Sequence, residues 1–170
     1  MDIIKVVRER RSIRKFIEKD IPEDILSSLM DALIWAPSAG NLQSRRFFFV
    51  KDKKIKHLLS GAALNQRFIH DAPVAIVCCT DSNIGRHYGQ RGKDLYTIQD
   101  VSASIMGMML VAHENGLGTC WVGAFHEEDV SKIMNLPRNL RPVAIIPVGF
   151  PAMIPQPPPR ISRQEAVEIV

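Results

Sequence analysis

The chain has 170 residues, of which 46% are hydrophobic and 24% are charged, and its formal net charge at pH 7 is +4. This length suits one domain spanning residues 1–170, and the apolar content is too high for an intrinsically disordered chain. No apolar run approaches the ~20 residues of a membrane span, and three cysteines, two of them adjacent, do not form a disulfide framework, so we expect a cytoplasmic protein with no membrane partner.

The expected elements mix helices and strands without a steady βαβ alternation, which favours an α+β fold with a central sheet. The first half is expected to hold a helix after Asp2, a helix with Asp20 as its N-cap that ends before Pro37, a loop over 36–41, a strand over 47–50, a helix over 53–61 and a strand over 74–79. The second half is expected to hold an exposed loop over 81–93, a long helix over 96–115, a strand over 119–122, a helix over 126–134, a strand over 143–148 and a last helix opened by the capping box Ser162-Arg163-Gln164-Glu165.

The long helix over 96–115 is expected to lie at the centre of the fold. Its apolar stripe consists of Ile98, Val101, Ile105, Met109 and Leu110, and Gly116 follows as the natural C-cap. Further methionines widen this stripe beyond what one core can cover, which indicates that part of the helix faces a second subunit. The adjacent Cys78 and Cys79 alternate across a strand and are expected to pack in the core.

Most signatures of catalysis are absent from the sequence. There is no GxGxxG fingerprint, no GxxxxGK[ST] loop and no GxSxG motif, and the five histidines have no zinc-ligand spacing. We therefore expect no catalytic nucleophile and no metal.

Basic residues gather in two segments. Arg8, Arg10, Arg11, Arg14 and Lys15 surround Ser12, and this mixture of guanidinium forks and a hydroxyl favours a phosphate as the partner. The lysines at 51, 53, 54 and 56 are interpreted as solvated surface.

Six segments in this order resemble the nitroreductase family, the FMN-dependent NAD(P)H oxidoreductases, in one of its shorter branches. They are RRSIRKF, APSAGNLQ, LYTIQDVSAS, ENGLGTCWVGAF, RPVAIIPVGFP and PPPR, and they span nearly the whole chain. The resemblance implies a central, mostly antiparallel sheet flanked by helices, and a homodimer with the long helix and two FMN sites at the subunit interface. Composition and spacing alone indicate only an anion-binding α+β domain.

The resemblance also implies roles for individual residues. Arg10, Arg11, Ser12 and Arg160 match positions that hold the FMN phosphate and ribityl chain, and Arg14 matches a position near flavin N1 and O2. The loop residues Pro37, Ser38, Ala39, Asn41 and Gln43 match a segment that reaches the flavin of the partner subunit. Trp121, Val122 and Gly123 match a segment along the flavin, where the amides of Val122 and Gly123 would face N5 and O4.

Two features depart from the family pattern. Ser44-Arg45-Arg46 stands where many members carry Pro-Trp, which alters a neighbour of the expected site. The chain also lacks the longer mid-chain segment that covers the substrate in larger members, so the segment 81–93 is the only candidate lid, with Arg86, His87, Tyr88 and Arg91 as its possible contacts.

The resulting hypothesis is an FMN-dependent oxidoreductase that takes a hydride from NADH or NADPH and passes electrons to a nitroaromatic, quinone or similar small-molecule acceptor by a ping-pong cycle. The flavin carries the chemistry, so no side chain has to act as acid or base. The alternatives are a flavin-destroying, dehalogenating or dehydrogenating enzyme of the same fold, and a flavin-binding module without turnover. An RNA-binding protein is disfavoured because aromatic residues are few and lie apart from the basic segments, so no nucleic-acid partner is expected.

Overall fold

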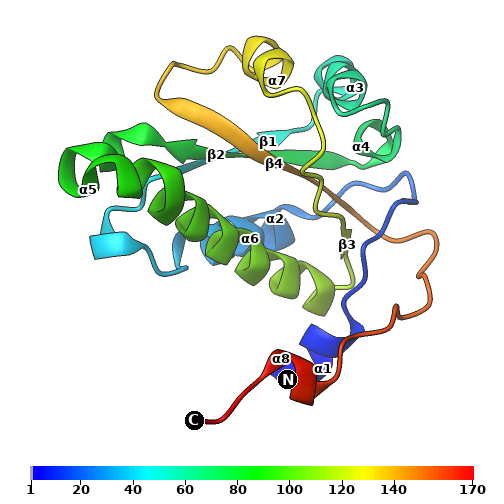
Figure 1. Cartoon of the computed structure of the whole chain (residues 1–170). Coiled ribbons are helices and arrows are strands. Elements are labelled where there is room, and N and C mark those ends of the chain that lie inside the picture. Colours follow the sequence, from blue (N-terminus) through cyan, green and yellow to red (C-terminus); the bar gives the residue numbers. More distant parts are fainter. Residues whose placement is uncertain (1) are drawn as a thin grey trace.

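An antiparallel sheet of four strands, in the order β1-β2-β4-β3, forms the middle layer of the computed structural model, which describes residues 2–170 (Figure 1). The strands are β1 (Arg45–Val50), β2 (Val74–Asp81), β3 (Gly118–Thr119) and β4 (Leu140–Gly149). One face is covered by α2 (Glu23–Ile34) and α6 (Thr97–Glu114), and the other by α3 (Lys53–Ala62), α4 (Phe68–Asp71) and α7 (Glu127–Ile133). The expected α+β architecture with an antiparallel sheet is thus confirmed.

The central strand β2 separates the two halves of the core. Its side chains alternate, so Ile76 and Cys78 pack toward α2 and α6 whereas Val77 and Cys79 pack toward α3 and α7. Both cysteines are fully buried, as expected from their adjacency in an apolar strand.

The buried cysteines lead to a chemical prediction. Burial raises the pKa of the Cys79 thiol to about 12 and also raises that of Cys78 well above its usual value, and Cys120 is buried as well. A thiol with a raised pKa carries almost no reactive thiolate near neutral pH. We expect none of the three thiols to react with a disulfide reagent at about pH 8 while the protein is folded, and all to react after unfolding. Rapid labelling of the native protein, followed by absorbance, would contradict the described packing.

Helix α6 runs beneath the sheet and ends as the sequence predicts. Gly116 takes a positive φ of 72°, and the amide of Leu117 donates to Ala112 O at 2.8 Å, which closes the last turn. Among the described residues, the run Ser82–Glu114 is the one helical stretch long and apolar enough to cross a membrane. Val101, Ile105 and Met108 are fully buried under the sheet, so this stretch is the core helix of a soluble fold.

The segment 81–93 is helical, and the expectation of an exposed loop is wrong. It forms η2 (Ser82–Ile84), α5 (Gly85–Arg91) and the start of a π-helical turn, η3 (Gly92–Tyr96), which leads directly into α6. Gly89 has φ 56° and ψ −144°, which interrupts the helical conformation. The polar sequence concealed the helix because α5 exposes most of its surface, with buried positions only at Ile84 and Gly92 near its ends.

Two further boundaries differ from the sequence expectations. Asp20 is exposed and does not cap a helix, because α2 begins at Glu23 with Pro22 at the N-cap position and no side-chain cap. The expected strand over 119–122 shrinks to Gly118–Thr119 and one bridge between Val122 and Ile145. Pro147 faces the intervening residues and has no N–H to donate, so the ladder breaks at Cys120 and Trp121.

The remaining helices lie at the two ends of the chain. Asp2 caps α1 (Ile3–Glu9) by accepting from the amides of Ile4 and Lys5. The predicted capping box opens α8 (Arg163–Ala166), with the Ser162 hydroxyl and the Glu165 carboxylate both engaged. The last hydrogen bond from the C-terminal segment to the body joins Ala152 N to Lys15 O at 2.9 Å, and within residues 153–170 the hydrogen bonds of the described structure are internal.

Candidate functional site

The segment after α1 lies against the segment after β3. Ile13 N donates to Thr119 O at 2.9 Å, and Ser12 forms a parallel bridge with Thr119. Gly118 allows this approach, because a Cβ at that position would lie 2.5 Å from Cγ1 of Ile13. The structure therefore brings the arginine-rich segment together with the segment over 121–123, although they are more than 100 residues apart in sequence.

Cys120 lies at the centre of this meeting point, and the sequence analysis did not single it out. Burial raises the pKa of its thiol, whereas the nearby positive charges of Arg14 and Arg10 act in the opposite direction. Ser12 acts on this pKa in the same direction as the two arginines. Phe68 is a second neighbour that sequence reasoning missed, and its ring centroid is 6.0 Å from Cζ of Arg14.

The guanidinium of Arg10 is partly buried and, among the described residues, lacks hydrogen-bond acceptors at two of its nitrogens. Its Nε and Nη1 atoms are buried and have no hydrogen-bond acceptor within residues 2–170. Burial, followed by repulsion from Arg160 and Arg11, lowers the pKa of this guanidinium. Buried donors are normally paired, so a concentration of unpaired positive charge indicates a site for an anion. A phosphate group carries the charge and the acceptor oxygens that this cluster lacks.

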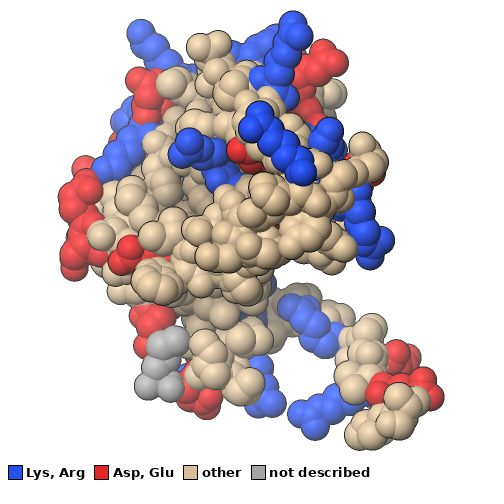
Figure 2. Space-filling model, turned by 90° about the vertical axis from the view of Figure 1, so that its left-hand side faces the viewer, with Lys and Arg blue, Asp and Glu red and all other residues tan. Residues whose placement is uncertain are grey.

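Arg160 and Arg11 lie beside Arg10 with donors oriented by the backbone. Arg160 Nη1 donates to Pro159 O at 3.0 Å, and Arg11 Nη1 donates to Arg8 O at 2.6 Å. In Figure 2, Lys and Arg side chains border an opening below the compact body. The sequence expectation that the C-terminal arginine joins the N-terminal ones is consistent with this arrangement.

The segment over 121–123 presents an exposed indole. Trp121 is 41% exposed, while Val122 is buried and its amide donates to Ile145 O at 3.0 Å. The expectation that the Val122 amide faces a ligand is therefore wrong, because the sheet already uses this N–H. Gly123 is exposed, and Gln66 holds the chain just beyond it by donating from Nε2 to Ala124 O at 3.1 Å.

The loop over 37–43 lies elsewhere. The amide of Ala39 donates to Oδ1 of Asp100, in the first turn of α6, whereas Thr119 follows the last turn of that helix. The stretch from Asp100 to Glu114 rises ~1.5 Å per residue and so separates the two sets by roughly 20 Å. Figure 1 shows the loop near the α5 end of α6 and β3 near its other end. Within one chain, Pro37, Ser38, Ala39, Asn41 and Gln43 do not join the other predicted site residues.

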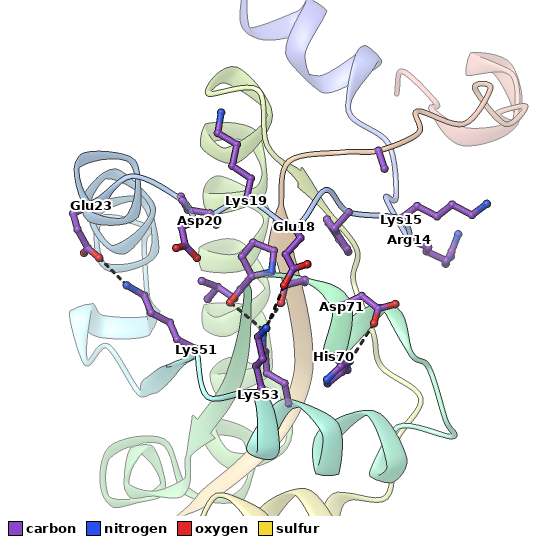
Figure 3. Close-up of a pocket in the computed structure, with 17 residues that line it drawn as sticks. Arg14, Lys15, Glu18, Lys19, Asp20, Glu23, Lys51, Lys53, His70 and Asp71 are labelled. Atoms are coloured by element: carbon purple, nitrogen blue, oxygen red, sulfur yellow. Dashed lines mark hydrogen bonds and ion pairs between the residues drawn. The ribbon is translucent and has the colours of Figure 1, made fainter.

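A large cleft of about 970 Å³ lies between the segment over 14–23 and the helices α3 and α4 (Figure 3). Two of its lysines form ion pairs, Lys51 with Glu23 at 2.7 Å and Lys53 with Glu18 at 3.2 Å. Of the predicted site residues only Arg14 lines it. The acidic side chains among its lining residues distinguish this cleft from the cluster around Arg10.

Lys56 corrects the interpretation of the lysine group as solvated surface. The residue is 3% exposed, and its ammonium donates to the carbonyls of Ala72 and Pro73 beside the cleft. Burial is the largest of the effects that lower the pKa of this ammonium. Four lysines within six residues resemble a solvated surface segment. Lys56 nevertheless faces the protein interior, because successive residues of a helix point to different faces.

Comparison with known proteins agrees with this architecture. The sequence profile of the nitroreductase family matches residues 7–66 and 56–150. The chain belongs to the nitroreductase family. A protein of Methanothermobacter thermautotrophicus, provisionally named NADH dehydrogenase/NAD(P)H nitroreductase, is 30% identical over 159 residues, covering 91% of this chain and 80% of its own.

Other nitroreductase relatives support the same placement. An FMN reductase [NAD(P)H] of Bacillus subtilis is 29% identical over 180 residues, covering 98% of this chain and 72% of its own. The solved structure of B. megaterium NfrA1 superposes with a TM-score of 0.90 at 26% identity, covering 99% of this chain and 74% of that one. The nitroreductase fold expected from the sequence is thus confirmed.

Proposed function

We propose that this member of the nitroreductase family is an FMN-dependent oxidoreductase that uses NADH or NADPH to reduce nitroaromatics, quinones or similar acceptors. The family and the names of its relatives make it an NAD(P)H-dependent flavin oxidoreductase in general terms. The observation that supports FMN in particular is the guanidinium of Arg10, whose Nε and Nη1 are buried without partners in the described structure and which the charges of Arg160 and Arg11 repel. A phosphate monoester supplies the negative charge and the acceptors that these side chains need.

Each residue of this set has a physical task in the proposal. Arg10, Arg11 and Arg160 bind the phosphate, and Ser12 contributes a hydroxyl to the phosphate and ribityl chain. Arg14, exposed beside Phe68, places a positive charge near the pyrimidine end of the flavin. Such a fixed cation favours the anionic reduced form of the cofactor.

The exposed indole of Trp121 and the backbone at Gly123 lie along the flavin in this proposal. Bound FMN supplies the two-electron chemistry, with donor and acceptor occupying the same face in turn. The protein contributes binding, orientation and charge, which accounts for the absence of a nucleophile or general base among its motifs.

The separation of the loop over 37–43 from the arginine cluster supports a homodimer. A loop about 20 Å from the cluster cannot complete the site of its own chain, but a two-fold axis brings it to the site of a partner. We propose that Ser38, Asn41 and their neighbours reach the partner's flavin. A cytoplasmic location accords with the free cysteines of the chain.

The proposal is tested by the absorbance of the purified protein and by its turnover. We expect a flavin spectrum, bleaching by NADH or NADPH under argon, and recovery of colour on adding a quinone or a nitroaromatic. A yellow protein that neither dinucleotide reduces would instead be a flavin-binding module. Reduction without turnover of these acceptors would favour a specialised flavoenzyme, and a colourless protein that takes up no added FMN would exclude all of these.

A further inference from the structure

Arg45 is a charged residue buried beneath the loop over 37–43. Arg45 is only 8% exposed. Its guanidinium donates to four backbone carbonyls, which are Ala36 O at 2.7 Å, Pro37 O at 2.9 Å, Ile34 O at 3.0 Å and Asp100 O at 3.4 Å. Its neighbour Arg46 on the same strand is exposed. The departure Ser44-Arg45-Arg46 thus places one arginine inside the protein and one outside.

One of the carbonyls that Arg45 binds, Ile34 O, belongs to the last residue of α2, and those of Ala36 and Pro37 follow directly after the helix. The last carbonyls of a helix have no partner within it, and a buried helix end needs donors from elsewhere. The positive charge of Arg45 also lies at the C-terminal end of the helix, where the backbone dipole favours a cation. Burial lowers the pKa of the guanidinium and the nearby Asp100 acts to raise it.

The other side of the loop is tied to the start of α6. Asp100 accepts from the amide of Ala39 at 2.9 Å, and Thr97 donates from its hydroxyl to Ser44 O at 2.6 Å. Because Arg45 also bonds to the carbonyl of Asp100, the side chain joins the end of α2, the loop and α6 in one network.

The loop has an unfavourable backbone that this network must hold. Gly40, Asn41 and Gln43 have φ of 54°, 55° and 51°, and two of these are not glycine. Residues in the left-handed region persist where the surroundings over-determine them. The contacts within the loop are few: Asn41 N to Ser38 O at 3.0 Å, Leu42 N to Ala39 O at 3.0 Å and Gln43 N to Ser38 Oγ at 3.0 Å.

We propose that Arg45 is a positioning residue, which holds the loop over 37–43 in the conformation that receives the cofactor. This inference rests on the proposed function, because it assigns a purpose to the loop conformation. Arg45 does not touch the cofactor: every hydrogen bond of its guanidinium in the described structure goes to backbone. The departure from Pro-Trp therefore changes how the loop is supported, and leaves the lining of the site to other residues.

The test compares three variants in the full-length protein. Arg45→Met keeps much of the side-chain stem and removes all donors, Arg45→Lys keeps the charge but cannot span the carbonyls, and Arg46→Met is the matched exposed control. The measurements are the FMN dissociation constant, from quenching of flavin fluorescence, and hydrogen exchange of the amides of Asn41, Leu42 and Gln43. The exchange of β2 amides reports global unfolding in the same samples.

We expect Arg45→Met to weaken FMN binding by roughly tenfold or more, because the loop must then be ordered at the expense of binding. Loop exchange should accelerate by about the same factor or more while β2 exchange changes less. Arg45→Lys should fall between wild type and Arg45→Met, and Arg46→Met should match wild type.

The outcomes separate this inference from the proposed function. Loop exchange and FMN affinity equal to those of Arg46→Met would overturn the positioning role, even if Arg45→Met lowered the melting temperature. If Arg45→Met fails to fold, Arg45→Lys decides by the same two measurements. If wild type binds no FMN, the proposed function fails. In that case the hydrogen exchange of the loop amides still tests the role of Arg45, and exchange in Arg45→Lys as slow as in wild type would show that Arg45 does not hold the loop.

Discussion

Alanine in place of Arg10 is expected to weaken FMN binding by about tenfold to a hundredfold and to leave the FMN-free protein as stable as wild type, or more stable. A charge-assisted contact with phosphate contributes ~1.5–3 kcal/mol, which corresponds to that change in affinity. The second effect has the opposite sign because the free protein holds this guanidinium partly buried, unpartnered at two nitrogens and repelled by Arg160 and Arg11. A residue retained for the fold would not behave in this way.

The measurements are titration with FMN and thermal unfolding of the FMN-free protein. Arg8→Ala is the matched control, since Arg8 is an exposed arginine in the last turn of α1, just before Arg10, and its carbonyl, which accepts from Arg11, remains in the variant. Arg160→Ala should show a similar loss of affinity, and Lys53→Ala, which removes an exposed ion pair with Glu18, should show none. Unchanged affinity in Arg10→Ala, or a clear loss of stability without FMN, would refute the assignment of the phosphate to this cluster.

Deletion of residues 153–170 is expected to convert the proposed dimer into a monomer and to release FMN. Beyond Ala152 the chain leaves the body, and it exposes Ile154, Ile161 and Ile169 by 69%, 70% and 97%. Trp35, at the end of α2, is 83% exposed as well. Apolar groups this open are stabilised by burial against another surface, and a second copy of the chain offers one. Because the segment also carries Arg160, its loss removes both a contact surface and a phosphate ligand.

Sedimentation velocity at several protein concentrations, with and without FMN, measures this outcome. Wild type should sediment as a dimer that FMN strengthens, since a ligand bound between subunits stabilises the assembled state. Arg160→Ala in the full-length chain is the control, because it removes the arginine that is proposed to bind the phosphate and keeps the apolar surface of the C-terminal segment. A wild-type monomer that holds FMN stoichiometrically would contradict the shared site and leave the flavoprotein proposal intact.

Sequence patterns predicted those parts of the fold that local chemistry dictates. The burial of β2 followed from its unbroken apolar run, and the ends of α6 and α8 followed from Gly116 and from the Ser162–Glu165 capping box. These features depend on residues a few positions apart. The arginines at 10 and 160 required the family resemblance, because no local pattern brings the two ends of a chain together.

The failures occurred where a distant residue decides the local structure. Pro147 limits β3 from across the sheet, and Lys56 turns inward because carbonyls at 72 and 73 receive its ammonium. Arg45 gave no sign that it was buried, since its partners are backbone carbonyls that a sequence does not mark. The helix at 85–91 has polar residues that are typical of an exposed helix as well as of a loop, so its sequence does not distinguish the two.

The separation of the arginine cluster from the loop along α6 implies that two defective variants can complement each other in a mixed dimer. If each site draws its arginines from one chain and its loop from the other, a chain altered at Arg10 and a chain altered at Asn41 are defective in different halves of the site. In a mixed dimer one site then carries both alterations and the other carries neither. Equal, random mixing of the two inactive chains should restore about a quarter of the sites. Two variants at Arg10 and Arg160, which lie in the same half, should restore none.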